Sequence, residues 1–382
     1  MDVPVHGFTA PGFAPVAEAF ARNLSELGDV GAAFAAYRDG EPVVDLWGGL
    51  ADPDTEAPWR EDTVQLVFSG AKGLVAACVL LLVERGLVDL GAPLARYWPE
   101  FAAAGKERIT VADVMSHQSR LPGVRKPFSV EQMLDAPFMA ALLAEQEPSA
   151  DPRAGFVYHA LTYGWLAGEL VRRTDGRDVG AFFGEEFAEP LGLDVWLGLP
   201  DALHPRAATT LAGPGLLAAP AEGPSGDALR DLMRNPLLVP GATTLWNSAA
   251  FRRAAPAAVS AFGTARSLAR FYACLARGGE IDGVRVLRPA TVERGRAELR
   301  RGTEGLWGSP MAYGAGFELH TELGLFGPAP DAFGHAGAGG SRHAAWPSQR
   351  IGFSYTPNHL RADSPDPRPL TLLAALATCA AS

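Results

Sequence analysis

Strand-like segments lie at both ends of this chain of 382 residues, and helical patterns fill its middle. Residues 30–37 and 42–47 are apolar, and Asp39-Gly40 between them is typical of a hairpin turn. Further strand-like segments follow residue 280, at 313–320, 331–335, 341–346 and 350–355, before a last helix over 370–380. A hairpin and a meander would each be a marginal sheet alone. We therefore expect one antiparallel or mixed sheet built from both ends of the chain.

The middle of the chain has the residue pattern of helices and few strand-like segments. Apolar residues recur at helical spacing over 161–173, and Asp175-Gly176 follows as a typical helix end. Residues 200–260 are rich in Ala, Pro and Gly, which we interpret as ordered loops over a site. The sequence thus predicts an α+β fold with a discontinuous sheet domain, 1–90 and 281–382, a mainly helical domain, 91–280, and a site in the groove between them.

Charge and hydropathy narrow the class of protein. The chain has 33 basic and 43 acidic residues, a net charge of −10, which disfavours nucleic acid because that partner requires a cationic surface. The longest apolar run, 73–83, is about half of the roughly 20 residues that a membrane span needs. The first residues do not resemble an export signal, so we expect a cytoplasmic protein.

The cysteines do not predict a cross-linked or metal-binding protein. Cys78, Cys274 and Cys379 lie far apart, without a Cys-x-x-Cys pair or a neighbouring pair of histidines. This spacing supports neither a disulfide scaffold nor a zinc site. We expect no metal and no cofactor, and the sequence leaves the oligomeric state open.

One short motif suggests nucleophilic chemistry. Ser69 and Lys72 form a Ser-x-x-Lys at the start of the helix predicted after Phe68. Residues three apart share a helical face, so the Lys72 amine can lie beside the Ser69 hydroxyl, and the helix N-terminus favours a developing alkoxide. An unassisted serine is a poor nucleophile, and a lysine in an apolar cleft loses its proton readily. Alone the motif is weak, because a capping serine and a solvated lysine would match it equally well.

The surrounding segments strengthen this interpretation. The chain resembles the serine β-lactamase and penicillin-binding-protein superfamily, and within it the class C-like family VIII carboxylesterases. The resemblance extends over most of the chain in the same order, through residues 66–74, 86–90, 114–123, 158–160, 163–173, 262–265 and 333–337. It implies a β-lactamase/transpeptidase-like fold, with a central antiparallel sheet flanked by helices and an inserted, mainly helical domain.

The resemblance also implies roles for particular residues. Ser69 would be the acylated nucleophile, Lys72 its proton partner, and Tyr158 the tyrosine that moves protons to and from the serine and the leaving group. His335 and Gly337 would stand in the substrate-binding Lys-Thr-Gly motif of the lactamases, on a strand beside the serine. The oxyanion hole would be formed by the backbone N–H groups of Ser69 and Ala338.

Three departures from the family pattern bear on the substrate. Tyr158 is followed by His159-Ala160, so the asparagine of Tyr-x-Asn is lost. Lys-Thr-Gly has become His335-Ala336-Gly337, which removes the cation and the hydroxyl that hold a β-lactam carboxylate. Arg120 stands where relatives usually have glycine. His335 is interpreted as a neutral donor to the substrate or to Tyr158, or else as a space-filling residue.

These features lead to two hypotheses of different classes. The preferred one is a serine hydrolase that cleaves small carboxylic esters through an acyl-enzyme, with weak β-lactam hydrolysis or acyl transfer as variants. A β-lactamase or a D-aminopeptidase-type amide hydrolase is the alternative within the same chemistry. The other class is a non-catalytic protein that uses the same cleft for binding. We interpret His117 and His159 as structural in either case.

Overall fold

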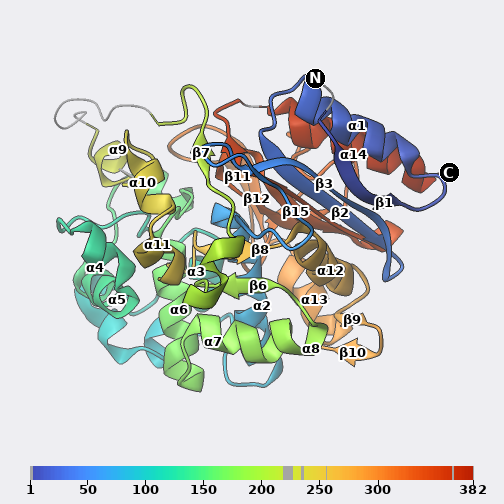
Figure 1. Cartoon of the computed structure of the whole chain (residues 1–382). Helices are drawn as coiled ribbons and strands as arrows, with labels where there is room; N and C mark the ends of the chain where they lie inside the picture. Colours follow the sequence, from blue (N-terminus) through green and yellow to red (C-terminus); the bar gives the residue numbers. More distant parts are fainter. Residues whose placement is uncertain (1–2, 218–226, 234–235, 255, 364, 382) are drawn as a thin grey trace.

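A ten-stranded antiparallel sheet forms the centre of the computed structural model, which describes residues 3–217, 227–233, 236–254, 256–363 and 365–381 (Figure 1). The strand order is β1-β3-β2-β16-β15-β14-β13-β12-β11, with β4 paired to β3. Both ends of the chain supply strands: β1 Val5–Thr9, β2 Gly31–Arg38, β3 Glu41–Asp52 and β4 Ala57–Pro58, then β11 Arg300–Thr303, β12 Pro310–Tyr313, β13 Glu318–Leu319, β14 Phe333–Ala336, β15 Arg342–Trp346 and β16 Ile351–Pro357. The predicted fold class and its central antiparallel sheet are confirmed.

The two ends of the chain join at the β2–β16 pair, whose register runs from Arg38 opposite Ile351 to Ala32 opposite Pro357. Alternating side chains of β2 enter two different cores, because successive residues of a strand face opposite sides of the sheet. The small residues of these central strands let a helix approach closely. A Cβ at Gly352 would lie 2.0 Å from the Ala273 nitrogen, in helix α12 (Ala265–Ala276).

Helices cover both faces of the sheet. On one face α1 (Ala14–Ser25) lies beside α14 (Pro367–Ala381), so the first and last helices of the chain share one hydrophobic core (Figure 1). On the other face α2 (Ala71–Glu84) and α12 pack in a larger core that continues into the helical middle. Ser69 and Lys72 lie where α2 begins, on this second face.

The middle of the chain is mainly helical, as the sequence predicts. Its helices, with the one that follows α12, are α3 Val111–Met115, α4 Val130–Leu134, α5 Ala136–Glu145, α6 Thr162–Asp175, α7 Val179–Phe183, α8 Glu189–Leu191, α9 Ala228–Leu232, α10 Ala242–Trp246, α11 Ala249–Arg253 and α13 Pro289–Arg296. Small sheets link these helices to the rest. They are β5 Gln65–Leu66 with β8 Ala261–Gly263 and β6 Val195–Leu197, β9 Glu280–Ile281 with β10 Val284–Arg285, and β7 Leu211–Ala212 with β17 His359–Leu360. The exact domain boundaries stay a prediction.

Three details differ from the sequence expectations. The strand predicted over 313–320 is wrong: the Gly314 N–H donates to the Phe317 carbonyl at 2.9 Å and Gly316 has a φ of +93°, so the chain turns between β12 and β13. Strand β1 and helix α1 were not predicted. Of the loops expected over 200–260, residues 218–226, 234–235 and 255 lie outside the described residues, and short helices and strands occupy part of the rest.

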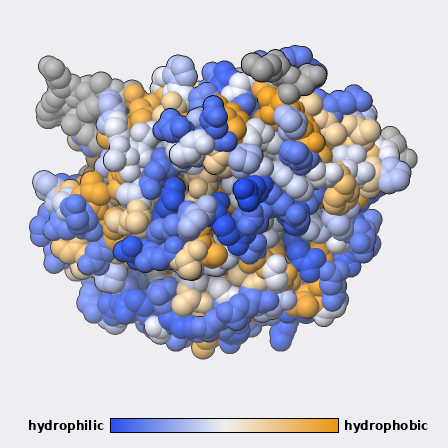
Figure 2. Space-filling model, viewed as in Figure 1, coloured by the Kyte–Doolittle hydropathy of each residue, from blue (hydrophilic) through white to orange (hydrophobic). Residues whose placement is uncertain are grey.

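The surface seen in Figure 2 is mostly hydrophilic, with hydrophobic side chains scattered in small patches. Among the residues that the structure describes, no helix combines the length and the apolar character needed to cross a bilayer.

Candidate active site

Ser69 lies in a strained turn between a strand and a helix. The 3₁₀ turn η1 (Phe68–Gly70) follows β5 and leads directly into α2. Phe68 has a φ of +45°, a left-handed conformation that is unusual for a bulky residue. Its ring is buried and meets Trp246 edge-on, with 5.2 Å between ring centres. Packing therefore holds a strained backbone at the residue before the serine, as is common at functional sites.

Lys72 lies beside Ser69, as the Ser-x-x-Lys spacing predicts. Its side chain is fully buried, and its Nζ is 3.1 Å from the Ser69 Oγ. Two backbone carbonyls accept from the same nitrogen, Ala160 at 2.9 Å and Ala258 at 3.0 Å. These two acceptors use two N–H bonds, so the third position on the nitrogen faces the serine hydroxyl.

The surroundings of Lys72 favour a neutral amine. Burial lowers the Lys72 pKa well below its usual value, and the more distant Glu318 carboxylate opposes this shift only in part. A neutral amine has two N–H donors and one lone pair. With both donors held by carbonyls, the lone pair points at Ser69, and Lys72 can accept the hydroxyl proton.

Tyr158 is the third member of the cluster. Its hydroxyl is hydrogen-bonded to the Ser69 side chain, and its ring centre is 4.9 Å from the Lys72 Nζ. Burial raises the Tyr158 pKa well above its usual value, and the Ser69 hydrogen bond opposes that shift. Tyr158 therefore stays a phenol while Lys72 tends to lose its proton. Two groups whose pKa values move in opposite directions can serve as acid and base.

Two buried side chains outside the predicted catalytic set hold the backbone of Tyr158 and His159. The buried Glu304 carboxylate accepts the Tyr158 N–H at 3.3 Å, and the Nδ1 of buried His117 accepts the next N–H, of His159, at 3.1 Å. The His117 ring also lies 4.8 Å from the Tyr158 ring, centre to centre. His159 bonds through its own ring to Ser119 Oγ, at 2.8 Å. Both histidines thus have structural contacts.

His335 lies on β14 next to these residues. Its side chain is buried, and its ring centre is 6.1 Å from that of Tyr158. Its Nδ1 lies 2.8 Å from the Ala336 carbonyl, which can only accept, so Nδ1 carries the proton. Burial lowers the His335 pKa to about 3. The neutral ring then offers Nε2 as an acceptor, so the donor role expected from the sequence is wrong for this tautomer.

Glu318 brings a buried carboxylate into the same region. It is the first residue of the short strand β13, and its Oε2 accepts the Ala336 N–H at 3.1 Å in place of a strand carbonyl. The same oxygen is 3.9 Å from the His335 Nδ1. Burial raises the Glu318 pKa above its usual value. This carboxylate does not stand out in the sequence, because the pattern over 313–320 predicts one continuous strand there.

Gly337 and Ala338 follow β14 and lie against the turn that carries Ser69. A Cβ at Gly337 would be 2.3 Å from the Val67 carbonyl oxygen and 2.2 Å from Ser341 Oγ, so no other residue fits. Ala338 begins the 3₁₀ turn η7 (Ala338–Gly340). The structure thus brings the His-Ala-Gly segment and the Ser-x-x-Lys segment into contact. The oxyanion role of the Ser69 and Ala338 amides stays a prediction.

Arg120 has a structural explanation. Its φ of +58° is a left-handed conformation that glycine adopts without strain, which fits the glycine that the resemblance implies at this place. Its Nη1 donates to the Ser149 carbonyl at 2.9 Å and to that of Asp151 at 3.3 Å. The guanidinium therefore braces the segment that leads to Tyr158.

Comparisons with known proteins agree with this geometry. Residues 20–377 match the beta-lactamase family. Over 369 residues the chain is 37% identical to the esterase/beta-lactamase LipL of Mycobacterium tuberculosis (strain ATCC 25618 / H37Rv), covering 94% of this chain and 84% of LipL. A family VIII carboxylesterase of known structure superimposes with a TM-score of 0.90 at 36% identity, covering 98% of this chain and 100% of that one. A penicillin-binding-protein homologue from Caulobacter crescentus gives a TM-score of 0.89 at 35% identity, with the same coverage of both chains.

Proposed function

Because the chain belongs to the beta-lactamase family, we propose that it is a serine carboxylesterase that works through an acyl-enzyme on Ser69. One observation carries the proposal: the buried Lys72 amine lies 3.1 Å from the Ser69 hydroxyl, with its other hydrogen-bonding positions held by two carbonyls. That arrangement supplies the Lys72 amine as the base for the serine.

Acylation follows from these positions. Lys72 takes the hydroxyl proton as Ser69 Oγ attacks the ester carbonyl carbon. The N–H groups of Ser69 and Ala338 stabilise the oxyanion that forms. When the tetrahedral intermediate collapses, the bond to the alcohol oxygen breaks and Tyr158 gives that oxygen its proton. The Lys72 ammonium then returns a proton to Tyr158, which leaves both groups as they started.

Deacylation uses the same groups with water in place of the serine. A water molecule attacks the acyl carbon while the neutral Lys72 amine accepts its proton. The acyl–serine bond breaks, Ser69 regains its proton, and the carboxylic acid leaves. An alcohol or amine that replaces this water would give acyl transfer, which we keep as a variant of the reaction.

The substrate we propose is a small, neutral ester. His335 is neutral above its pKa of about 3, so the His-Ala-Gly segment offers no cation for a carboxylate. Ala160 lacks the amide that lactamases direct at the substrate side chain. Loss of a charged hydrogen bond costs about 1.5–3 kcal/mol. We therefore propose β-lactam hydrolysis as a weak side activity, which the name of its relative LipL, esterase/beta-lactamase, supports.

The experiment that tests the proposal combines turnover and labelling. We expect wild-type protein to hydrolyse p-nitrophenyl esters of short acids and to form one fluorophosphonate adduct, on Ser69. Ser69→Ala should lower kcat by about 10⁴- to 10⁶-fold and abolish the adduct. Ser25→Ala is the matched control, because the exposed Ser25 hydroxyl donates to the Ala21 carbonyl of its own helix.

Two results would contradict the proposal. Folded wild-type protein that forms no adduct and turns over no ester would support the binding protein of the same fold. Undiminished turnover by Ser69→Ala would place the chemistry elsewhere. A series of esters of increasing chain length measures the size of the acyl group in the same assay. Residence in the cytoplasm stays a prediction from the sequence, and fractionation of cells that make the protein checks it.

A further inference from the structure

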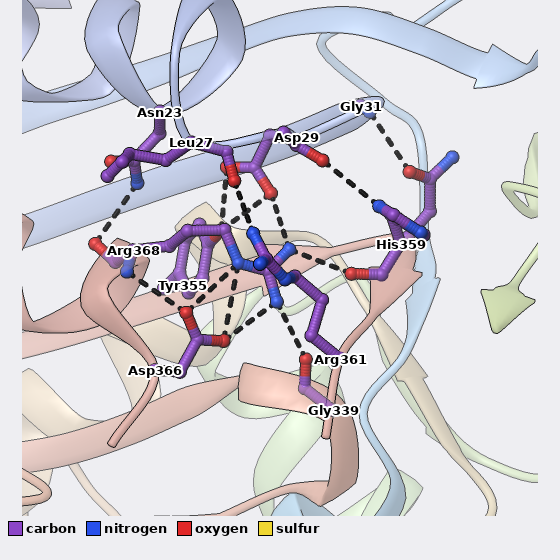
Figure 3. A network of polar contacts seen from close by, with 12 residues as sticks. Asn23, Leu27, Asp29, Gly31, Gly339, Tyr355, His359, Arg361, Asp366 and Arg368 are labelled. Carbon is purple, nitrogen blue, oxygen red and sulfur yellow. Dashed lines mark hydrogen bonds and ion pairs between the residues drawn. The ribbon is translucent and has the colours of Figure 1, made fainter. Parts of the chain in front are cut away.

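A buried arginine lies behind the turn that carries Ala338. Arg368 belongs to the first turn of α14, and its side chain has no exposed surface. Its guanidinium pairs with Asp29 Oδ1 at 2.9 Å and with Asp366 Oδ2 at 2.7 Å, and both carboxylates are buried as well (Figure 3). Buried ion pairs of this kind add little net stability, because removing the charges from water costs about as much as their attraction returns.

The network joins segments from both ends of the chain. Asp29 precedes β2, and its two carboxylate oxygens accept from the Tyr355 hydroxyl on β16 at 2.8 and 2.7 Å. Arg368 also donates to the His359 carbonyl at 2.8 Å, through Nη1. The residues converge on the guanidinium from α14, from the start of β2 and from the chain after β16 (Figure 3).

One terminal nitrogen of the Arg368 guanidinium reaches the turn beside the active site. Its Nη2 donates to the Gly339 carbonyl at 3.0 Å, and Gly339 directly follows Ala338 (Figure 3). The Arg361 N–H donates to the same oxygen at 3.1 Å. Together with the contacts to Asp29, Asp366 and His359, this bond uses all five N–H groups of the guanidinium. Arg368 therefore has no donor left for a substrate.

The turn has little freedom to move independently of this bond. The Gly337 N–H donates to the Ser341 carbonyl at 3.0 Å, which closes the loop around η7. Gly339 has a φ of +81°, and a Cβ there would lie 2.3 Å from the Leu360 Cβ. Gly337 is pressed against Val67, just before the serine turn. The position of the Gly339 carbonyl consequently sets that of the Ala338 amide relative to Ser69.

We propose that Arg368 is a positioning residue for the oxyanion hole, because it holds the Gly339 carbonyl and thereby fixes the Ala338 N–H against Ser69. The inference rests on the proposed function. It assigns the buried network a task in transition-state stabilisation. Preorganised donors stabilise an oxyanion only when they already stand in place, and a misplacement of about 1 Å can cost about 100-fold in rate.

The test compares Arg368→Met and Arg368→Lys with wild-type protein. The matched control is Arg361→Met, since the Arg361 side chain bonds the Leu27 carbonyl and Asp363 and its backbone bond to Gly339 survives the substitution. Each variant is assayed with p-nitrophenyl acetate, and with phenylboronic acid, which forms a tetrahedral adduct with a reactive serine. Circular dichroism defines a temperature at which every assayed variant is folded.

We expect Arg368→Met to lower kcat by about 10- to 100-fold and to raise the inhibition constant of the boronic acid by a similar factor, with KM changed less than about threefold. Arg368→Lys keeps the positive charge but lacks the planar guanidinium with its several N–H donors. We therefore expect smaller changes in kcat and in the inhibition constant. Arg361→Met should stay within about twofold in all three quantities. A merely structural role would lower the melting temperature without this matched change in kcat and inhibition.

If Arg368→Met does not fold, Arg368→Lys decides the question. A folded Arg368 variant whose kcat and boronic-acid affinity both stay within about twofold of wild type overturns the proposal. Failure of the proposed function looks different, because wild-type protein itself would then hydrolyse no ester and form no adduct on Ser69.

Discussion

At the scale of single residues, the chemistry depends on backbone atoms that surround one lysine. The Lys72 nitrogen contacts the Ala160 and Ala258 carbonyls, which lie 88 and 186 residues away in the chain. No carboxylate of the described residues lies within hydrogen-bonding distance of it. Burial lowers the Lys72 pKa, which Glu318 opposes only in part, and burial raises the pKa of Tyr158. Desolvation is therefore the main effect that distinguishes the base from the acid.

This environment predicts a pH profile. Lys72 is active as a free amine, so kcat/KM should rise as the pH rises through its pKa, which burial places well below the usual value. The rate should then stay level, because Tyr158 keeps its proton beyond the usual range of a phenol. Rates with a short-chain p-nitrophenyl ester between pH 4 and 10 provide the measurement, with Ser69→Ala protein subtracted for spontaneous hydrolysis. A rate that still climbs near pH 10, as for a solvated lysine with a pKa of about 10.4, contradicts the assignment.

At the scale of elements, the site depends on close contact between the end of β14 and the turn η1. Gly337 permits this contact, because a Cβ there would meet the Val67 carbonyl oxygen at 2.3 Å. Gly70 has a similar task on the other side of Ser69, where a Cβ would lie 2.6 Å from the His343 ring. Two glycines thus let a strand, a turn and a helix meet at one serine.

Substituting the first of these glycines should separate the elements. We expect Gly337→Ala to lower kcat/KM by about 100-fold, because the backbone of β14 must move away from Val67 and carry Ala338 with it. Gly91→Ala is the control, since the nearest atom to a Cβ there lies at 3.7 Å and the backbone needs no left-handed conformation. Steady-state kinetics of folded protein decide the matter, and a Gly337→Ala enzyme with near-normal kcat/KM would show that the contact is dispensable.

At the scale of the whole molecule, the two faces of the sheet have different tasks. The face covered by α1 and α14 lies away from the serine and holds the two ends of the chain together (Figure 1). The opposite face, with α2 and α12, carries the active site. Most substitutions in the core between the sheet and the helices α1 and α14 should therefore change the free energy of unfolding and leave kcat unchanged. Arg368 is the exception, because it reaches the turn after β14.

Leu376 tests this separation. It is fully buried on α14, so Leu376→Ala should lower the free energy of unfolding by about 2–5 kcal/mol through the lost contacts and the cavity left behind. At temperatures where the variant is folded, kcat should remain within about twofold of wild type. Leu87→Ala, at a side chain that is 47% exposed, should change stability by no more than about 0.5 kcal/mol. Denaturant unfolding and ester hydrolysis measure the two effects. A large loss of kcat in folded Leu376→Ala protein would contradict the prediction, because it would show that the two faces of the sheet are coupled.

Features with a local pattern could be predicted from the amino-acid sequence. Helical spacing placed Lys72 beside Ser69, the Asp-Gly turn marked the β2–β3 hairpin, and strand signals at both ends implied a shared sheet. The resemblance added Tyr158 and the segment around His335, which the structure brings next to Ser69. Side-chain identity and short-range periodicity carry these features, so they can be recognised before the chain is folded.

The surroundings of those residues depend on how the chain folds and could not be predicted from the sequence. The carbonyls at Lys72, the carboxylate of Glu318 and the arm of Arg368 come from distant segments, and a backbone oxygen leaves no mark in a sequence. The turn at Gly314 and Gly316 ended a strand that apolar residues had suggested, because local glycine conformation prevailed over the pattern. Burial depends on how the whole chain packs, and it is burial that lowers the Lys72 pKa and keeps His335 neutral.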